Sequence, residues 1–221
     1  MEPHTTETPQ SSPRATKRER TRARLLANAI ALFRKQGVRE TRLAEVAEAS
    51  EVAPATLFNH FPSRAALASA WVRGEIEQEA GAVARAVCEE ARGLRASVRA
   101  LCRELADRNA PEPVARWAAW QEAGRVRGHG VLGFQEAFAL EQQREHVRAD
   151  RSPEMLAEML MDAIEGGLVA GLTVVVESRA SDERARARDL AGRIQTRVDL
   201  VLDGARKRNE RVRPAAPGQR G

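Results

Sequence analysis

Residues 25–71 of the chain, LLANAIALFRKQGVRETRLAEVAEASEVAPATLFNHFPSRAALASAW, decide its fold. They contain three apolar-periodic segments separated by connections of only a few residues. The first segment ends at Gly37, a residue type that commonly ends a helix, and its apolar positions at helical spacing are Leu26, Ala29, Ile30 and Phe33. The second segment runs from Thr41, a capping residue type, to Ala49, with core positions Leu43, Val46 and Ala47.

The third segment, residues 54–60, is about two turns long and follows the tight connection Ser50-Glu51-Val52. Pro54 takes the first helical position, where its missing N–H costs nothing. Leu57 and Phe61 are spaced to turn inward, which leaves the other positions outside. Two short helices joined by a turn and braced by a longer helix are typical of a helix-turn-helix, whose second helix enters the major groove of DNA. A helix about 10–12 Å across fits a groove about 12 Å wide.

One ordered set of residues runs through this stretch: Leu32-Phe33, Gly37, Thr41, Val46-Ala47, Val52, Thr56-Leu57-Phe58, His60-Phe61, Ser63-Arg64 and Leu67. This order resembles the N-terminal domain of the TetR family of transcriptional regulators, over about a quarter of the chain. The resemblance implies an all-α fold, with an N-terminal three-helix helix-turn-helix domain before a larger helical ligand-binding and dimerisation domain. It also implies a ligand-responsive regulator, most often a repressor, that binds a pseudo-palindromic operator as a homodimer and is released by a small-molecule effector.

Composition and helix-breaking residues divide the chain into four parts. Residues 1–15 are rich in Pro, Ser and Thr and are expected to be a disordered arm. The helix-turn-helix domain spans 16–73, opened by a capping box at Thr16-x-x-Glu19, and its fourth helix runs from Pro62-Ser63 towards Val87. The helical domain spans 74–206, with further helices expected at 94–109, 112–127, 131–148, 153–178 and 182–206. Residues 207–221 form a basic tail expected to be disordered.

The net charge of +5 is unevenly distributed. Residues 1–24 carry six basic and three acidic side chains, and residues 204–221 carry six and one. The middle, residues 74–203, carries 18 and 23. Basic ends on an acidic body suit a protein that docks on DNA, although basic tails that only keep the protein soluble are the alternative.

The expected DNA contacts follow the two short helices. Thr56 and Asn59 are the best candidates for base edges, since Asn pairs with adenine and Thr contacts the thymine methyl group. Phosphate contacts are expected from Thr41, Arg42, His60, Ser63 and Arg64. The complete predicted set is Thr41, Arg42, Ala53, Pro54, Ala55, Thr56, Phe58, Asn59, His60, Ser63 and Arg64. For each residue alone, an ordinary cap or surface role is the alternative.

Several residues depart from the family's usual pattern. Phe58 stands where a Tyr is common, Pro54 and Ala55 where Lys and Gly are frequent, and Glu51 where the turn usually has Gly. These departures favour a DNA recognition that depends more on the N-terminal arm and on the shape of the DNA. The basic residues of the first helix either reach flanking phosphates or form a solvated face; they are Lys17, Arg18, Arg20, Arg22 and Arg24.

Two apolar stripes mark the last long helices, near 153–178 and 182–206, through which the resemblance implies homodimerisation. The first consists of Met155, Leu156, Met159, Leu160, Ala163, Ile164, Leu168 and Leu172, and the second of Leu190, Ile194, Val198, Val201 and Leu202. Gly166, Gly167 and Gly171 indicate close helix approach or a pocket wall. The alternative is that both stripes belong only to the subunit core.

A small-molecule site is predicted from a concentration of aromatic residues in a chain that is only 4% aromatic. The predicted ligand-binding residues are Trp117, Trp120, Gln121, His129, Phe134 and Phe138. Aromatic core packing is the alternative for any one of them. The acidic balance of this domain favours a neutral or cationic ligand.

Other chemistry is not indicated. Cys88 and Cys102 lie in helical patterns, and no His or Cys pair shows metal-ligand spacing, so neither a metal nor a cofactor is expected. No apolar run long enough for a bilayer and no signal peptide are recognised, and a cytoplasmic protein is expected. Two other function classes are an enzyme using Glu122 with His129, which lacks a nucleophile and base constellation, and an architectural, non-specific DNA-binding protein without a ligand.

Overall fold

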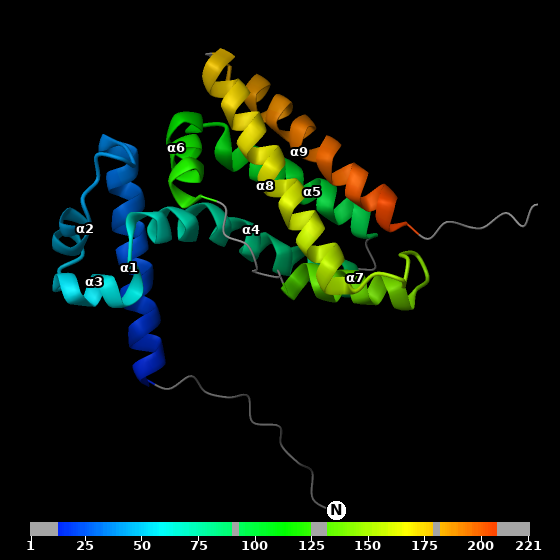
Figure 1. Ribbon diagram of the computed structural model, residues 1–221, viewed down its shortest axis with the longest axis horizontal. Helices are drawn as coiled ribbons and strands as arrows, with labels where there is room; N and C mark the ends of the chain where they lie inside the picture. Colours follow the sequence, from blue (N-terminus) through cyan, green and yellow to red (C-terminus); the bar gives the residue numbers. More distant parts are fainter. Residues whose placement is uncertain (1–12, 90–92, 125–131, 179–181, 207–221) are drawn as a thin grey trace, which may run out of the picture.

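The computed structural model describes residues 13–89, 93–124, 132–178 and 182–206. Within these ranges the chain forms nine α-helices and no strand, with one isolated antiparallel bridge between Val147 and Arg206 (Figure 1). The all-α fold class is therefore confirmed. The helices are α1 (Pro13–Gln36), α2 (Leu43–Ala49), α3 (Pro54–His60), α4 (Arg64–Cys88), α5 (Leu94–Asn109), α6 (Pro113–Ala123), α7 (Leu132–Gln143), α8 (Pro153–Ser178) and α9 (Glu183–Ala205).

Helices α1 to α3 form a small lobe at one end of the molecule (Figure 1). Helix α1 begins at Pro13, so the predicted capping box at Thr16 does not open it, and the last residues of the predicted disordered arm are helical. Residues 1–12 of that arm and the tail 207–221 lie outside the described residues. The lobe is held together by one buried cluster, to which each helix contributes: Leu25, Ala29, Phe33, Val46, Ala47, Leu57 and Phe61.

Helix α4 connects this lobe to a larger bundle. Helices α6 and α7 each pack against α4 on one side and α8 on the other, and α5 packs against α4 and α9. Figure 1 shows α8 and α9 lying side by side along one edge of the bundle. Helices α6 and α7 thus both lie between α4 and α8, and the predicted aromatic residues lie on these two helices.

Besides the start of α1, several predicted helix boundaries are wrong, and three of them show a local physical reason. The predicted helix 41–49 begins at Leu43, because Thr41 lies before it and Arg42 is its N-cap. The predicted helix 112–127 ends at Ala123, since Gly124 has a φ of +63°. The predicted helix 131–148 ends at Gln143, and Glu145 in the following turn has a φ of +60°. By contrast, the predicted helices 54–60, 94–109 and 153–178 are confirmed.

The glycines of α8 mark close approach to α9, which confirms the first of the two readings that the sequence allowed. A Cβ added at Gly167 would lie 2.6 Å from the Ile194 Cα, and one added at Gly171 would overlap a Leu190 methyl group. The lack of side chains lets the two helix backbones meet, and the cost of glycine in a helix is offset by this packing.

Helix α8 also corrects an expectation about membranes. At 26 residues it is long and apolar enough to cross a bilayer by length and composition, although the sequence suggested no such run. Core helices of soluble proteins pass the same test, and ten residues of α8 are buried against its neighbours, among them Leu160, Ile164 and Leu168. We therefore describe α8 as a core helix of the bundle.

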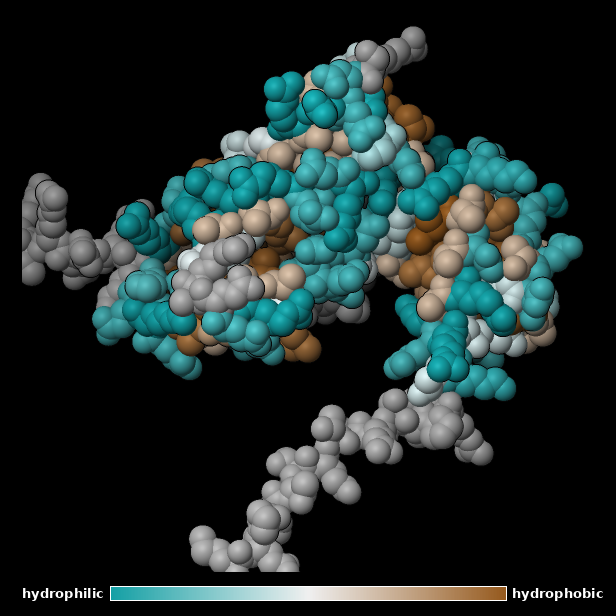
Figure 2. Space-filling view, turned by 180° about the vertical axis from the view of Figure 1, so that it is seen from behind, coloured by the Kyte–Doolittle hydropathy of each residue, from teal (hydrophilic) through white to brown (hydrophobic). Residues whose placement is uncertain are grey.

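Figure 2 shows the rear face of the molecule, which is mostly hydrophilic with scattered hydrophobic patches. The lobe formed by α1 to α3 stands apart from the bundle, so the outer sides of its helices are open to solvent (Figures 1 and 2).

Candidate nucleic-acid interface

Helix α3 turns one side chain into the core and most of the others outward. Leu57 is fully buried, whereas Phe58 keeps 50% of its surface exposed. Of the remaining predicted contacts on this segment, Thr56 and His60 are half-buried, and the exposed ones are Ala53, Pro54, Ala55 and Asn59. The outer face of α3 is thus small, uncharged apart from a titratable His, and able to approach another surface closely.

The turn before α3 is supported by a residue that the sequence reasoning missed. The Asn28 side chain on α1 donates hydrogen bonds to the Ala49 carbonyl at 2.9 Å and to the Ser50 Oγ at 3.0 Å. These bonds tie the long helix to the turn between α2 and α3. The sequence holds one signal for this role: Asn28 has an amide side chain and directly precedes the buried Ala29, close to the apolar face of the helix.

Glu51 gives the turn its shape, with a φ of +51°. This left-handed conformation is the one that Gly adopts at little cost, so the common Gly of the family at this position has a backbone reason. The Val52 N–H donates to the Ala47 carbonyl at 3.1 Å and closes the turn. Glu51 in place of the usual Gly therefore keeps the geometry of the turn and adds strain to its backbone.

Thr41 does not lie on the outer surface. Its side chain is buried, with 2% of the residue exposed, and its hydroxyl donates to the Gly37 carbonyl at 2.7 Å. It therefore supports the connection between α1 and α2, and the role predicted for it as helix cap is wrong. Arg42 takes that place: Glu45 accepts from the Arg42 backbone N–H at 3.1 Å, and the Arg42 side chain is 82% exposed.

The predicted phosphate contacts at the start of α4 are engaged within the protein. Ser63 is the N-cap of α4, and its hydroxyl accepts from the Ala66 N–H at 3.1 Å. Arg64 donates from Nε and Nη2 to the two carboxylate oxygens of Glu122, at 3.0 and 3.2 Å, and from Nη1 to the Arg39 carbonyl at 2.6 Å. Arg64 thus joins α6 to the connection between α1 and α2.

The basic residues of α1 lie along its first turns, and the side chains of Lys17, Arg18, Arg20, Arg22 and Arg24 are exposed. Arg22 is the one that reaches α3, since its Nη1 donates to the His60 carbonyl at 2.8 Å. Burial, with smaller contributions from the positive charges of Arg18 and Arg22, holds the pKa of His60 below its usual range. At neutral pH the ring is therefore uncharged in the free protein.

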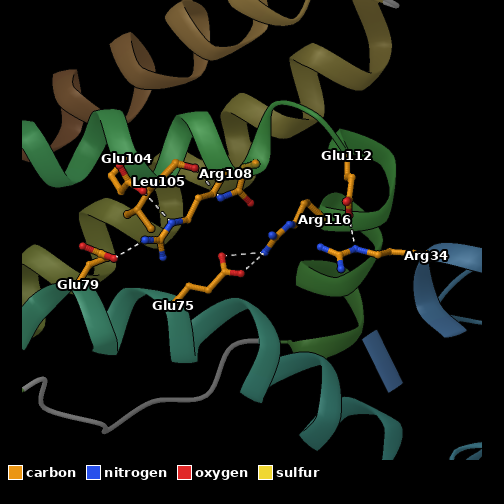
Figure 3. Close-up of polar contacts among 9 residues, drawn as sticks. Arg34, Glu75, Glu79, Glu104, Leu105, Arg108, Glu112 and Arg116 are labelled. Carbon is orange, nitrogen blue, oxygen red and sulfur yellow. Dashed lines mark hydrogen bonds and ion pairs between the residues drawn. The ribbon is translucent and has the colours of Figure 1, made fainter. Parts of the chain in front are cut away.

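A second bond between the lobe and the bundle lies at the other end of α6. Arg34 of α1 donates to Glu112, the N-cap of α6, at 2.7 Å, and its guanidinium lies 5.7 Å from the Trp71 ring centroid. Arg116 approaches the same ring to 4.6 Å and bonds both carboxylate oxygens of Glu75 at 2.8 Å. Figure 3 shows Arg34 bonded to Glu112 and Arg116 bonded to Glu75. One end of α6 is therefore bonded to α1 and the other to Arg64 at the start of α4.

The predicted ligand residues are divided between α6 and α7. Trp117 is half-buried and donates from Nε1 to the Thr173 hydroxyl at 3.1 Å, whereas Trp120 is buried and its indole N–H bonds no described residue. Phe134 and Phe138 of α7 are fully buried. Gln121 is exposed, and His129 lies outside the described residues. Trp120, Phe134 and Phe138 lie in the core, Trp117 packs against it, and Trp120 adds a buried donor.

Arg73 of α4 lies beside Trp120, with its guanidinium 5.5 Å from the ring centroid. It is buried and donates to Glu165 of α8 at 2.8 Å, to the Ser69 hydroxyl at 2.7 Å and to the Gly124 carbonyl at 2.6 Å. Arg73 therefore connects the end of α6 with α8 across α4.

The apolar stripes of α8 and α9 serve mainly the subunit core. Most of their members are buried within the chain, among them Leu160, Ile164, Ile194 and Val198. The members that face outward are Met155 and Met159, each 47% exposed, and on α9 the neighbouring Leu200 is 72% exposed. Large hydrophobic side chains are thus left on the outer side of both helices.

Among the described residues, no group of three or more His, Cys, Asp or Glu side chains is placed to hold a metal ion. Burial raises the pKa of Cys102 to about 12, so its thiol is unreactive at neutral pH. Cys88 is exposed. The carboxylate of Glu122, which the enzyme alternative pairs with His129, is bonded to Arg64.

The N-terminal lobe is similar to a known family of proteins. Residues 25–71 match the family model described as bacterial regulatory proteins, tetR family. No curated protein matches the chain. The matched segment contains α2, α3, their turn and the parts of α1 and α4 that pack against them.

Solved structures extend the likeness to the whole fold. The TetR-family repressor FadR of Thermus thermophilus, crystallised with lauroyl-CoA, is 23% identical with a TM-score of 0.63, over 89% of this chain and 99% of that one. A TetR-family regulator of Pectobacterium atrosepticum is 24% identical with a TM-score of 0.53, over 87% and 97%. A complex of SmeT with triclosan is 17% identical with a TM-score of 0.51, over 85% and 92%. At these identities the fold is what the structures share.

Proposed function

Because the chain belongs, through the domain of residues 25–71, to the TetR family of bacterial regulatory proteins, we propose that it is a cytoplasmic repressor with a pseudo-palindromic operator, a homodimeric state and a small-molecule effector. Its coarser role is that of a DNA-binding transcriptional regulator. The observation that carries the proposal is the outer face of α3, where Thr56, Phe58 and Asn59 surround the buried Leu57. A helix with such a face fits the major groove.

The base contacts are proposed for Thr56 and Asn59, and Phe58 is proposed to pack against a thymine methyl or the sugar edge. Arg42 is the proposed phosphate contact at the start of α2, since its guanidinium is mostly exposed. Ala53, Pro54, Ala55, His60 and Ser63 are proposed to line the contact surface. Thr41 and Arg64 are left out of this set, because the Thr41 hydroxyl and the Arg64 guanidinium are engaged in bonds within the protein.

The test is selection of bound fragments from genomic DNA, followed by affinity measurements on the selected site and on a random duplex of the same length. We expect the selected site to bind at least 1,000-fold more tightly. Exchanging Thr56 and Asn59 together for Ala should remove most of that preference, whereas Gln78→Ala on the exposed side of α4 should leave it unchanged. Equal affinity of the unmodified protein for both duplexes would identify a non-specific architectural DNA-binding protein instead.

The proposed dimer uses the outer side of α8 and α9. The exposed Met155, Met159 and Leu200 support it, because a face with several large apolar side chains is typical of a surface that a second copy covers. Two copies are also needed to place two recognition helices about 34 Å apart. In sedimentation experiments we expect Met159→Glu with Leu200→Glu to give monomers. Val114→Glu, at a 63% exposed position of α6, should remain dimeric.

The proposed effector site lies between α6 and α7, bounded by α4 and α8. The aromatic side chains of Trp120, Phe134 and Phe138 favour a largely apolar molecule. Two proteins that share the fold were crystallised with lauroyl-CoA and with triclosan, which have large apolar parts. The buried indole N–H of Trp120 favours an effector with an oxygen acceptor. In a screen for ligands that raise the melting temperature, Trp120→Phe should weaken the response to such compounds and leave operator binding unchanged.

A further inference from the structure

We propose that Arg22 is a positioning residue for α3: it holds the C-terminal end of the recognition helix and does not serve as a phosphate contact. This inference rests on the proposed DNA-binding function. Arg22 belongs to the basic row on α1, for which the sequence left open a phosphate contact or a solvated face. The structure places it in a third role, within the N-terminal lobe.

The first contact is a hydrogen bond at the end of α3. The last carbonyls of a helix have no partner within the helix, and the short α3 has no glycine after it to supply a Schellman-type cap. The Phe61 N–H closes the last turn on the Leu57 carbonyl at 2.8 Å, and the Arg22 Nη1 donates to the last carbonyl of the helix, that of His60, at 2.8 Å. A guanidinium here also complements the negative end of the helix.

The second contact fixes the direction of the side chain. The guanidinium carbon of Arg22 lies 4.1 Å from the centroid of the Phe61 ring, which is buried in the core of the lobe. One planar cation thus stacks on the residue that ends α3 while it donates to the residue before it. Because both contacts use the same group, the guanidinium is held in one place and orientation.

The third observation is where this contact falls in the lobe. Helix α3 packs chiefly against α2, and α1 packs chiefly against α2 and α4, so Arg22 adds a polar link from α1 to α3 beside the apolar core that they share. Arg22 lies three residues before Leu25, the first buried residue of α1 in the described chain, and it links α1 to the far end of α3 (Figure 1). A recognition helix must keep its angle within the groove for its side chains to meet base edges, so loss of this link reduces base discrimination first.

Arg20 supplies the matched control. It lies in the same basic row, its side chain is exposed, and no hydrogen bond or ion pair of its side chain occurs among the described residues. Arg20→Gln and Arg22→Gln remove the same charge from neighbouring positions of one helix. A difference between the two variants therefore reports the contacts of Arg22 and not its charge.

The experiment compares the two variants on the selected operator and on a random duplex over a range of salt concentrations. We expect Arg22→Gln to weaken operator binding about tenfold or more. The affinity of Arg22→Gln for random DNA should equal that of Arg20→Gln. The slope of log K against log salt should also be the same for the two variants. Arg22→Lys should recover only part of the loss, because an ammonium keeps the charge and the donor but lacks the planar stack. If Arg22→Gln instead weakens binding to both duplexes equally and makes the salt slope smaller by about 0.9, Arg22 is a phosphate contact and the proposal is overturned.

A measurement without DNA separates this proposal from the function it rests on. Hydrogen exchange of the α3 amides should be at least severalfold faster in Arg22→Gln than in the unmodified protein or in Arg20→Gln, while exchange in α8 stays unchanged. Unchanged exchange in α3 overturns the positioning role, whatever the DNA results. An unmodified protein that prefers no sequence overturns the proposed function, while the exchange result still decides the role of Arg22.

Discussion

The Arg64 guanidinium bonds both carboxylate oxygens of Glu122, with Nε at 3.0 Å and Nη2 at 3.2 Å. This pair joins the start of α4 to the end of α6, and Arg34 with Glu112 joins α1 to the N-cap of the same helix. A ligand that shifts α6 would therefore displace the lobe through two ion pairs as well as through α4. Such a shift changes operator affinity only by the ratio of the ligand's affinities for the two arrangements.

We predict that Arg64 and Glu122 are energetically coupled. Both side chains are partly exposed, 32% and 20%, so the pair should be worth about 1 kcal/mol. A double-mutant cycle with Arg64→Gln and Glu122→Gln, read by urea unfolding, should give a coupling energy of that size. Glu77→Gln, an exposed carboxylate on α4, should show no coupling to Arg64→Gln. Additive effects of the first two changes would mean that the pair contributes nothing to joining the domains.

The strained turn gives a prediction about stability. Glu51 has a φ of +51°, a conformation that costs a residue with a side chain about 1–2 kcal/mol. Glu51→Gly should therefore raise the free energy of unfolding, by roughly 0.5–1 kcal/mol after the greater freedom of the unfolded chain is counted. Glu48→Gly, in the last turn of α2, should lower it instead. Urea unfolding of both variants provides the measurement, and destabilisation by Glu51→Gly would contradict the strain.

The lobe was predictable from sequence because local signals there agree with one another. Pro54, the apolar spacing around Leu57 and the short connections all point to the same two helices, and α3 has the predicted bounds. The predictions failed where a side chain had more than one partner available. Thr41 is expected to cap a helix, yet its hydroxyl donates to the carbonyl of Gly37, only four residues earlier, so a second local partner competes with the capping role.

Longer-range partners were beyond the sequence for the same reason. Arg64 and Glu122 are 58 positions apart, and no periodicity links α4 to α6. The ends of α6 and α7 were placed too late, because helical pattern continues beyond the positive φ at Gly124 and into the turn at Glu145. In contrast, the glycines of α8 were interpretable at once, since their cost in a helix needs a compensating contact.

The close approach of α8 and α9 predicts a position that tolerates no side chain. A Cβ at residue 167 would lie 2.6 Å from the Ile194 Cα, so Gly167→Ala must push the two helices apart. We expect a loss of about 1–3 kcal/mol in the free energy of unfolding, as for an overpacked core. Gly74→Ala in α4, where an added Cβ meets nothing within 4 Å, should instead stabilise the protein by about 0.5–1 kcal/mol. Thermal unfolding of the two variants compares them, and equal melting temperatures would contradict the packing argument.

The lowered pKa of His60 predicts how DNA binding depends on pH. Burial, followed by the charges of Arg18 and Arg22, favours the neutral ring in the folded protein. Its contribution to stability is therefore complete above the unfolded pKa of about 6.5 and is lost as the pH falls below that value.

A DNA phosphate beside the His60 ring acts in the opposite direction and raises the pKa in the complex. Protons are then taken up on binding, so operator affinity should increase as the pH falls from 7.5 towards 6, at constant ionic strength. His60→Gln should remove this increase and also the loss of stability at low pH. Fluorescence anisotropy on the operator and urea unfolding across this range measure the two effects, and parallel affinity curves for both proteins would show that His60 lies away from the phosphates.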